Sequence, residues 1–374
     1  MFSLPDDLIY LNMAYMSPNL VKVGMAGIES VLRKNNPTSI SQADFFEPVD
    51  EIRRLFSQLI NNAHPDKTTI IPSVSYGIAN VAQNVPLEEG EEIIIVGEQF
   101  PSNYYVWERV ANEAKAHITT IAADNAHPNR GADWNQRILD AITPKTKVVT
   151  MPIVHWADGT LFDLKAIRAK TSACDALLVI DGTQSIGALP FDLQEIPVDA
   201  LICAAYKWLL GPYSIGVAYY GDFFKDGTPI EDSWMNHENS DDFANLVAYN
   251  SVYRSGARRY EVGEASNFTL LPMFKAALEQ VLQWQPQYIQ DYCRSITEKP
   301  LAHLVEKGFK VEATQWRSHH LFGIRLAEGM DMEQVKKRLK AKNIFVSYRG
   351  DAIRVAPHLY NVEGDLEALA LALV

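Results

Sequence analysis

Short runs of apolar residues recur through the first two thirds of the chain, with amphipathic segments between them. The runs are rich in Ile and Val and predict strands at 67–75, 91–100, 116–123, 145–156, 175–182, 198–206 and 214–221. Most runs lack strict alternation of apolar and polar residues, which is expected of strands covered on both faces. Helical spacing lies between them, at 75–85, 103–117 and 135–144. This order of elements predicts an α/β fold with a mostly parallel sheet.

The pattern changes after about residue 265. Residues 271–308 predict long helices, with Pro300 interrupting the helical pattern, and residues 319–374 predict strand, helix, strands and helix. We therefore expect a large domain and a smaller α+β domain, with the N-terminal segment beside the small domain and the active-site entrance. The expected boundaries are 1–20 for that segment, 21–264 for the large domain and 265–374 for the small domain.

Composition and charge exclude several classes of protein. The 374 residues carry a formal charge of −12 with no basic block to offset it, which argues against a nucleic-acid partner. No stretch approaches the ~20 apolar residues of a membrane helix, and the first residues lack the features of a signal peptide. Cys174, Cys203 and Cys293 are too scattered for a disulfide framework or a metal site. A cytoplasmic location is expected, with no bound metal.

Two charged residues follow apolar runs that read as central strands. Asp181 comes after "ALLVI" and Lys207 after "ALICAAY". A carboxylate at such a strand end costs several kcal/mol to desolvate without a cationic partner. A desolvated lysine has a lowered pKa and can form a Schiff base with a carbonyl. The pair fits a pyridoxal phosphate site, in which the acid keeps the pyridine nitrogen protonated. A buried Asp–Lys ion pair is the alternative from these two residues alone.

Residues 179–216 contain "VIDGTQSIGALPFDL" and "VDALICAAYKWLLGPYSIG", ending in a Gly-Pro-x-x-x-Gly turn. This stretch resembles the cofactor segment of the class V aminotransferases, a family that includes cysteine desulfurases, kynureninases and isopenicillin N epimerase-like proteins. The resemblance implies the fold type I of pyridoxal phosphate-dependent transferases, with a mostly parallel seven-stranded sheet flanked by helices. It also implies that Lys207 is the Schiff-base lysine, that Asp181 is the pyridinium partner, and that Gln184 contacts the cofactor's phenolic oxygen or the Schiff-base region.

Other segments resemble the rest of the family's cofactor site. "PSVSYGIANVA" is similar to the phosphate-binding strand–loop–helix, where a helix N-terminus binds anions; simple helix capping by its serines is the alternative. Phe100 in "GEQFPSNYY" occupies the position of a ring that stacks on the cofactor, as in the kynureninase-like branch. Trp156 stands where desulfurases have an asparagine beneath the phenolic oxygen. The cofactor contacts implied beside Asp181, Gln184 and Lys207 are Ser73, Val74, Ser75, Phe100, Trp156 and Tyr206.

"YRGDAIRVAPHLYN" is similar to the segment that binds the substrate's α-carboxylate. Arginine suits this role because its planar fork pairs with a carboxylate, and Arg354 is the first candidate, with Arg349 second. "YLNMAYMSP" resembles a stretch at the substrate entrance, which implies roles for Asn12 and Tyr15. "GARRYEVGEASNF" resembles a segment that crosses to the partner subunit, which implies a homodimer with phosphate contacts from Ser266 and Asn267.

The resemblance implies a pyridoxal phosphate enzyme that acts on a small amino acid. The loop before the C-terminal segment lacks the desulfurase cysteine, and kynureninases commonly have a histidine where Gln184 stands. Aminotransferase is the favoured activity, with lyase or hydrolase chemistry (kynureninase-like or C–S lyase) and epimerisation as alternatives. A catalytically silent binding protein is disfavoured because the lysine and acid are retained. A nucleotide-binding enzyme is disfavoured because no GxGxxG or Walker loop follows an early strand.

Overall fold

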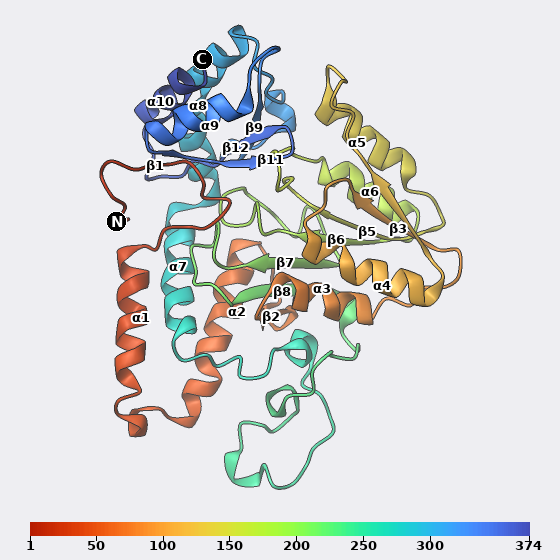
Figure 1. Cartoon of the computed structure of the whole chain (residues 1–374). Coiled ribbons are helices and arrows are strands. Elements are labelled where there is room, and N and C mark those ends of the chain that lie inside the picture. Colours follow the sequence, from red (N-terminus) through yellow and green to blue (C-terminus); the bar gives the residue numbers. More distant parts are fainter.

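The computed structural model describes all residues, 1–374, and places the seven predicted strands in one sheet (Figure 1). The sheet consists of β2 (Thr68–Ile71), β3 (Glu92–Val96), β4 (His117–Ile121), β5 (Thr146–Pro152), β6 (Leu177–Asp181), β7 (Ala200–Ala204) and β8 (Gly216–Tyr220). Their order is β2-β8-β7-β6-β5-β3-β4, and β8 alone runs antiparallel to its neighbours. The predicted α/β class and the mostly parallel seven-stranded sheet are confirmed.

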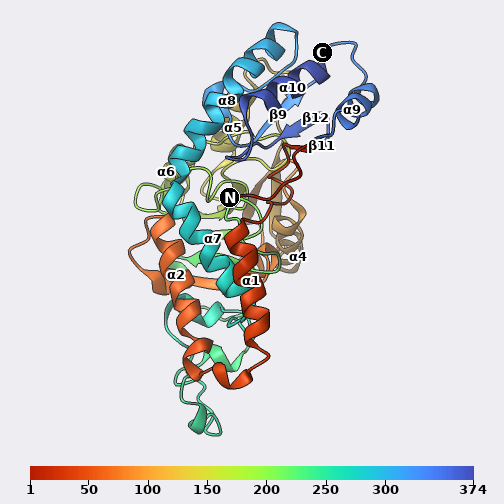
Figure 2. The ribbon, with the colours of Figure 1, turned by 90° about the vertical axis from the view of Figure 1, so that its left-hand side faces the viewer.

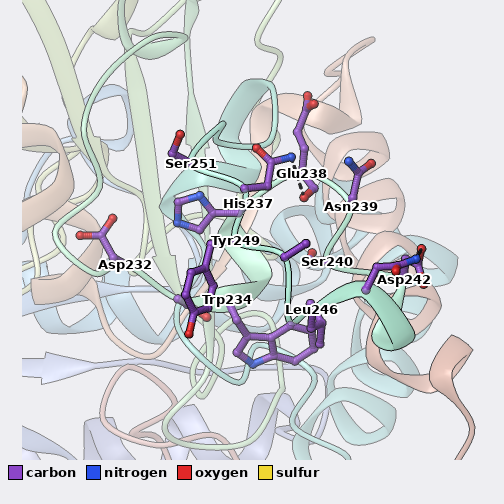
Figure 3. Close-up of a pocket in the computed structure, with 14 residues that line it drawn as sticks. Asp232, Trp234, His237, Glu238, Asn239, Ser240, Asp242, Leu246, Tyr249 and Ser251 are labelled. Atoms are coloured by element: carbon purple, nitrogen blue, oxygen red, sulfur yellow. Dashed lines mark hydrogen bonds between the residues drawn. The ribbon is translucent and has the colours of Figure 1, made fainter.

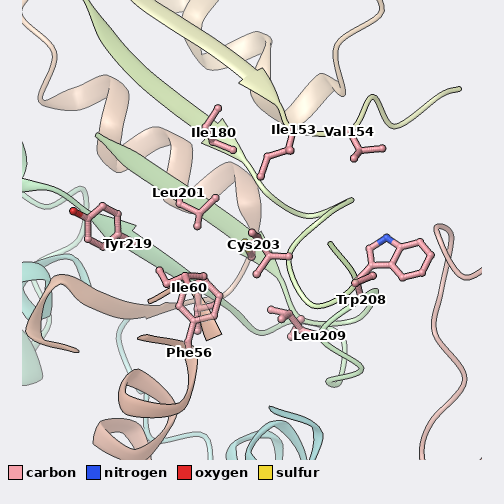
Figure 4. Packing of buried hydrophobic residues seen from close by; sticks show 14 of the residues in the cluster. Phe56, Ile60, Ile153, Val154, Ile180, Leu201, Cys203, Trp208, Leu209 and Tyr219 are labelled. Carbon is pink, nitrogen blue, oxygen red and sulfur yellow. The ribbon is translucent and has the colours of Figure 1, made fainter. Parts of the chain in front are cut away.

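Both faces of this sheet are covered by helices, which explains why its strands lack alternation. One face packs against α3 (Val74–Gln83) and α4 (Tyr105–Ala114). The other face packs against α2 (Glu47–Leu59), α5 (Arg130–Ala141), α6 (Leu164–Ala173) and α7 (Leu270–Trp284). Neighbouring residues of β7 point to opposite faces, so that Ile202 lies in the first core. Cys203 lies in the second core, which Figure 4 shows.

A second, three-stranded antiparallel sheet lies at the top of Figure 1, in the order β11-β12-β9. It consists of β9 (Phe322–Arg325), β11 (Ser347–Arg349) and β12 (Ala352–Val355), with α8 (Pro286–Glu306), α9 (Met332–Ala341) and α10 (Glu363–Leu373). A separate hydrophobic core joins these elements. The N-terminal β1 (Ile9–Tyr10) pairs in parallel with β10 (Ile344–Phe345), so the N-terminal segment lies beside this smaller sheet.

The predicted interruption at Pro300 is wrong, because α8 continues through this residue and buries it. The break between the two long helices falls instead at Gln285, which has a left-handed φ of 67°. Pro286 then occupies the first turn of α8, where the missing N–H costs no intrahelical hydrogen bond.

Helix α7 packs against α1 (Val21–Arg33) and α2, whereas α8 packs against α10 (Figure 2). The chain therefore passes from the elements packed on the large sheet to those packed on the small sheet between α7 and α8. The boundary expected at residue 265 stays a prediction. None of the helices combines the length and apolar character needed to cross a membrane.

Candidate active site

Asp181 and Lys207 face the same cavity. Asp181 is the last residue of β6, and Lys207 follows the end of the parallel neighbour β7. Parallel strands present their carboxyl ends at one edge of the sheet, so the topology brings the acid and the amine together. The cavity has a volume of about 300 Å³. Nine of the predicted site residues line it, namely Ser73, Val74, Ser75, Phe100, Trp156, Asp181, Gln184, Tyr206 and Lys207.

The two charged groups are buried and are not joined in an ion pair. The Asp181 carboxylate accepts the backbone N–H of Thr183 at 3.0 Å, and burial raises the pKa of this carboxyl. Burial lowers the pKa of Lys207 to about 8, although the charge of Asp181 acts in the opposite direction. The alternative of a direct Asp–Lys ion pair is therefore not what the structure contains. A buried carboxylate without a cation lies beside an amine with a near-neutral pKa.

One end of the cavity is suited to an anion. Ser73 caps α3 by accepting the Tyr76 N–H at 3.2 Å, and its hydroxyl lies 2.9 Å from that of Ser75. The first N–H groups of a helix have no intrahelical acceptor and favour negative charge. Helix capping and anion binding use the same geometry here, so the two interpretations of these serines are compatible.

These residues fit pyridoxal phosphate. The helix N-terminus matches the phosphate, and the uncompensated Asp181 carboxylate matches a protonated ring nitrogen. Lys207 matches the aldehyde carbon, with its Nζ atom 5.6 Å from the ring centroid of Phe100. The Phe100 ring offers an apolar surface to an aromatic cofactor.

Gln184 has one amide hydrogen left for the cavity. Its Oε1 atom accepts the indole N–H of Trp208 at 2.9 Å, and its Nε2 atom donates to the Ala14 carbonyl at 3.0 Å. A primary amide carries two hydrogens, so the second remains unused. Trp156, in contrast, donates its only side-chain N–H to the Glu98 carbonyl at 2.6 Å. Gln184 can therefore donate a hydrogen bond to a cofactor oxygen, whereas the Trp156 side chain can contact it only through its ring.

Trp156 links the cavity wall to the two predicted substrate arginines. Its ring packs edge-to-face against Phe100, with centroids 5.4 Å apart, and the Arg349 guanidinium lies 5.4 Å from its centroid. Its carbonyl accepts a hydrogen bond from Nη1 of Arg354 at 2.8 Å. Neither arginine forms an ion pair with a carboxylate of this chain, and neither belongs to the lining of the cavity.

Arg354 lies behind the cavity wall instead of lining it. Only 2% of the residue is exposed, and burial, with the neighbouring charge of Arg349, lowers its pKa to about 9. Its Nη2 atom donates to the Ser347 hydroxyl, which donates in turn to Oδ1 of Asn12. Tyr15 lies at the surface, 58% exposed. The structure thus connects Asn12 to Arg354 but gives neither Asn12 nor Tyr15 a place in the cavity lining.

Ser266 and Asn267 lie away from the cavity of their own chain. Asn267 accepts the N–H groups of Thr269 and Leu270 at the start of α7, and the Ser266 hydroxyl contacts the sulfur of Met235. Their predicted phosphate contacts across a subunit interface stay a prediction.

Several residues that line the cavity were not predicted from the sequence. Thr183 donates its N–H to Asp181 and accepts the Ala204 N–H through its hydroxyl at 3.1 Å, so it joins the ends of β6 and β7. Tyr213 and Ser214 also line the cavity. They belong to the "GPYSIG" turn, and this motif could have indicated them. The lining residues to which the sequence analysis gave no role are Pro72, Ser102, Thr183, Ala204, Tyr213, Ser214 and Ile215.

A larger hollow of about 660 Å³ lies elsewhere, in the segment 232–251 that projects at the bottom of Figure 1. Its lining includes Asp232, Glu238 and Asp242 beside Trp234 and Tyr249 (Figure 3). None of the predicted site residues belongs to it. The smaller cavity around Lys207 is therefore the candidate active site.

Known proteins resemble this chain along nearly its whole length. The uncharacterized aminotransferase YcbU of Bacillus subtilis is 27% identical over 321 residues, which cover 86% of this chain and 81% of YcbU. Isopenicillin N epimerase of Streptomyces clavuligerus is 22% identical over 335 residues, or 86% and 83% of the two chains. A cysteine desulfurase of Synechococcus elongatus is 25% identical over 361 residues, or 92% and 55%.

Solved structures confirm the fold. The cystine C–S lyase C-DES, in complex with its product cysteine persulfide, superposes with a TM-score of 0.86 at 19% identity, covering 98% of this chain and 97% of its own. The cysteine desulfurase CsdA of Escherichia coli gives a TM-score of 0.81 at 20% identity, covering 99% and 95%. The family model described as aminotransferase class-V matches residues 31–365. Because that match spans most of the chain, the protein belongs to the class V aminotransferase family of pyridoxal phosphate-dependent enzymes.

Proposed function

We propose that the protein is an aminotransferase that acts on a small amino acid. The observation that carries this proposal is the shared cavity of Asp181 and Lys207, at the carboxyl ends of adjacent parallel strands and next to the free N-terminus of α3. When bound, pyridoxal phosphate supplies an electron sink for a carbanion next to the substrate nitrogen. The remaining chemistry belongs to the side chains.

Each side chain has a role that follows from its surroundings. Lys207, with a pKa of about 8, is part neutral and part protonated near pH 8, so its amine can accept a proton from the substrate's Cα and return it. With the cofactor bound, Asp181 would hold the ring-nitrogen proton, and the start of α3 with Ser73, Val74 and Ser75 would hold the phosphate. Phe100 would offer its ring face to the cofactor. Gln184 would donate its free amide hydrogen to the phenolic oxygen, and Tyr206 lines the side of the cavity.

The products of a single turnover test the proposed reaction. The loaded enzyme is incubated with each of a panel of small amino acids, without a second substrate. Amino transfer releases one equivalent of the 2-oxo acid and no ammonia, because the nitrogen stays on the cofactor. Stoichiometric ammonia would instead indicate the lyase alternative. Exchange of the Cα hydrogen with deuterated solvent, with loss of optical purity and no net conversion, would indicate the epimerase alternative.

Replacement of Arg354 by lysine is expected to raise KM for amino-acid substrates roughly ten- to a hundredfold, because a charged hydrogen bond is lost with the planar fork. Lysine keeps the positive charge, but its three N–H groups cannot donate to the Trp156 carbonyl and to Ser347 and still form two parallel bonds to a substrate carboxylate. Steady-state kinetics and a cofactor titration measure the result. An equal loss of cofactor affinity would contradict carboxylate binding. The matching change at Arg349 identifies which arginine dominates.

We also propose that the enzyme is a homodimer with phosphate contacts from the partner. Lys207 is the only cationic side chain in the cavity lining, so a phosphate dianion would draw further contacts from outside this chain. The projecting segment 232–251 exposes Tyr249 fully and Val247 to 86%, which suits contact with a second copy. Sedimentation of a fully active monomer would contradict this proposal.

The cytoplasmic location expected from the scarce cysteines stays a prediction.

A further inference from the structure

Asp158 is a buried carboxylate that joins three elements of the fold. Its Oδ2 atom forms an ion pair with Nη2 of Arg130 on α5 at 2.7 Å and accepts a hydrogen bond from Nη2 of Arg325 on β9 at 2.9 Å. His155 contacts the same carboxylate at 3.2 Å, and Thr160 donates to it through its hydroxyl at 2.9 Å. Only 3% of Asp158 is exposed, and it does not line the active-site cavity. The residue is thus fully paired within the protein and has no direct route to a ligand.

The loop that carries Asp158 is fitted closely against the approach to β9. Gly159 has a φ of +75°, and a Cβ atom there would lie 2.3 Å from the Leu321 carbonyl oxygen. Gly323 approaches Asp158 so closely that its own Cβ would lie 3.0 Å from the Asp158 side chain. Glycine is therefore needed at 159, and a side chain at 323 would press against Asp158. The loop has little freedom while the carboxylate keeps its partners.

The same loop supports Arg354. Trp156 lies two residues before Asp158 and forms part of the cavity wall. Its carbonyl accepts a hydrogen bond from the Arg354 guanidinium at 2.8 Å. Arg354 lies on β12 opposite Gly323 of β9, two residues from Arg325. One short loop therefore holds arginines from adjacent strands, Arg325 by the Asp158 carboxylate and Arg354 by the Trp156 carbonyl.

We propose that Asp158 is a positioning residue for substrate binding, which fixes the Trp156 carbonyl and through it the Arg354 guanidinium. A guanidinium must be aimed before it can receive a carboxylate through two parallel bonds, and the loop supplies the acceptor that aims it. This inference rests on the role proposed above for Arg354. It assigns to Asp158 an effect on substrate affinity that its distance from the cavity would not suggest.

The Asp158→Asn variant tests the inference, with Asp199→Asn as the matched control. Asp199 is also paired with an arginine and with a backbone N–H, but it precedes β7, at the opposite end of the strand from Lys207. In the holoenzyme, Asp158→Asn is expected to raise KM for the amino acid roughly tenfold or more. It should change kcat by less than about threefold and leave cofactor affinity unchanged. Asp199→Asn should leave KM unchanged.

A milder variant keeps the test valid if Asp158→Asn does not fold. Arg325→Gln leaves Asp158 its contacts with Arg130 and His155, and it should raise KM in the same direction by a smaller factor. Arg325→Lys, which retains the charge, should restore part of the affinity. A KM equal to that of the wild type in both Asp158→Asn and Arg325→Gln, or one that rises equally in Asp199→Asn, would overturn the inference. A wild-type holoenzyme that responds to no amino acid would instead contradict the proposed function.

Discussion

Replacement of Lys207 by methionine is expected to abolish turnover and the visible absorbance of the purified enzyme. Methionine has nearly the length of lysine and lacks the amine, so the cavity stays filled while the covalent link to the cofactor is lost. Loss of the acid–base group alone costs about 10²–10⁴-fold in rate. Borohydride reduction followed by peptide mapping should label Lys207 in the wild type and no other lysine in the variant. A visible band that survives, or a label elsewhere, would show that another residue holds the cofactor.

The same variant should be more stable than the wild type when both lack cofactor, which separates its lost activity from unfolding. The pKa of Lys207 is about 8 in the folded protein and 10.5 as its ordinary value. A lowered pKa means that the folded state holds the proton less tightly than the unfolded state, so stability rises with pH between these values. At pH 7 the buried charge costs about 3 kcal/mol, which methionine removes.

Urea unfolding of the two cofactor-free proteins at several pH values measures this difference. The advantage of the methionine variant should be largest at pH 7 and below, shrink above pH 8, and be nearly gone by pH 10.5, where both states of the wild type are largely neutral. A variant less stable than the wild type at pH 7 would contradict the interpretation of Lys207 as a desolvated amine.

The central part of the site could be predicted from the sequence because it depends on local patterns. Asp181 and Lys207 each end an apolar strand, and parallel strands bring such ends to one edge. Phe100, Gln184 and the serines at the start of α3 likewise lie within four residues of the end of a strand of the large sheet. For these residues, position along the chain determines position in space.

The parts that were missed depend on contacts between distant segments. The Asp158 network joins residues 130, 158 and 325, and no spacing in the sequence marks three such residues as neighbours. The burial of Arg354 behind Trp156 depends on how the small sheet docks against the loop after β5. The continuity of α8 through Pro300 likewise depends on tertiary packing, since the residue is buried against other elements.

Replacement of Asp181 by asparagine is expected to separate cofactor binding from catalysis. Asparagine has the same shape and can still accept the Thr183 N–H, so the end of β6 should be preserved. Lys207 remains, so the visible absorbance should survive. Turnover should fall about 10²–10³-fold, because a neutral amide would not keep the ring nitrogen protonated, and an unprotonated ring would stabilise the negative charge formed on Cα–H cleavage less well.

Absorbance, cofactor affinity and single-turnover rate, measured together, check this expectation, with Asp199→Asn as the control for loss of an arginine-paired carboxylate just before β7. Unchanged turnover would show that Asp181 does not serve the ring nitrogen. Loss of absorbance in step with turnover would make it a binding residue only. Burial raises the pKa of Asp181 because the carboxylate is desolvated and has no cation in direct contact. A protonated ring nitrogen would provide that cation. Because the asparagine variant loses this pairing, it should bind the cofactor more weakly. Its cofactor affinity should fall by a smaller factor than its turnover.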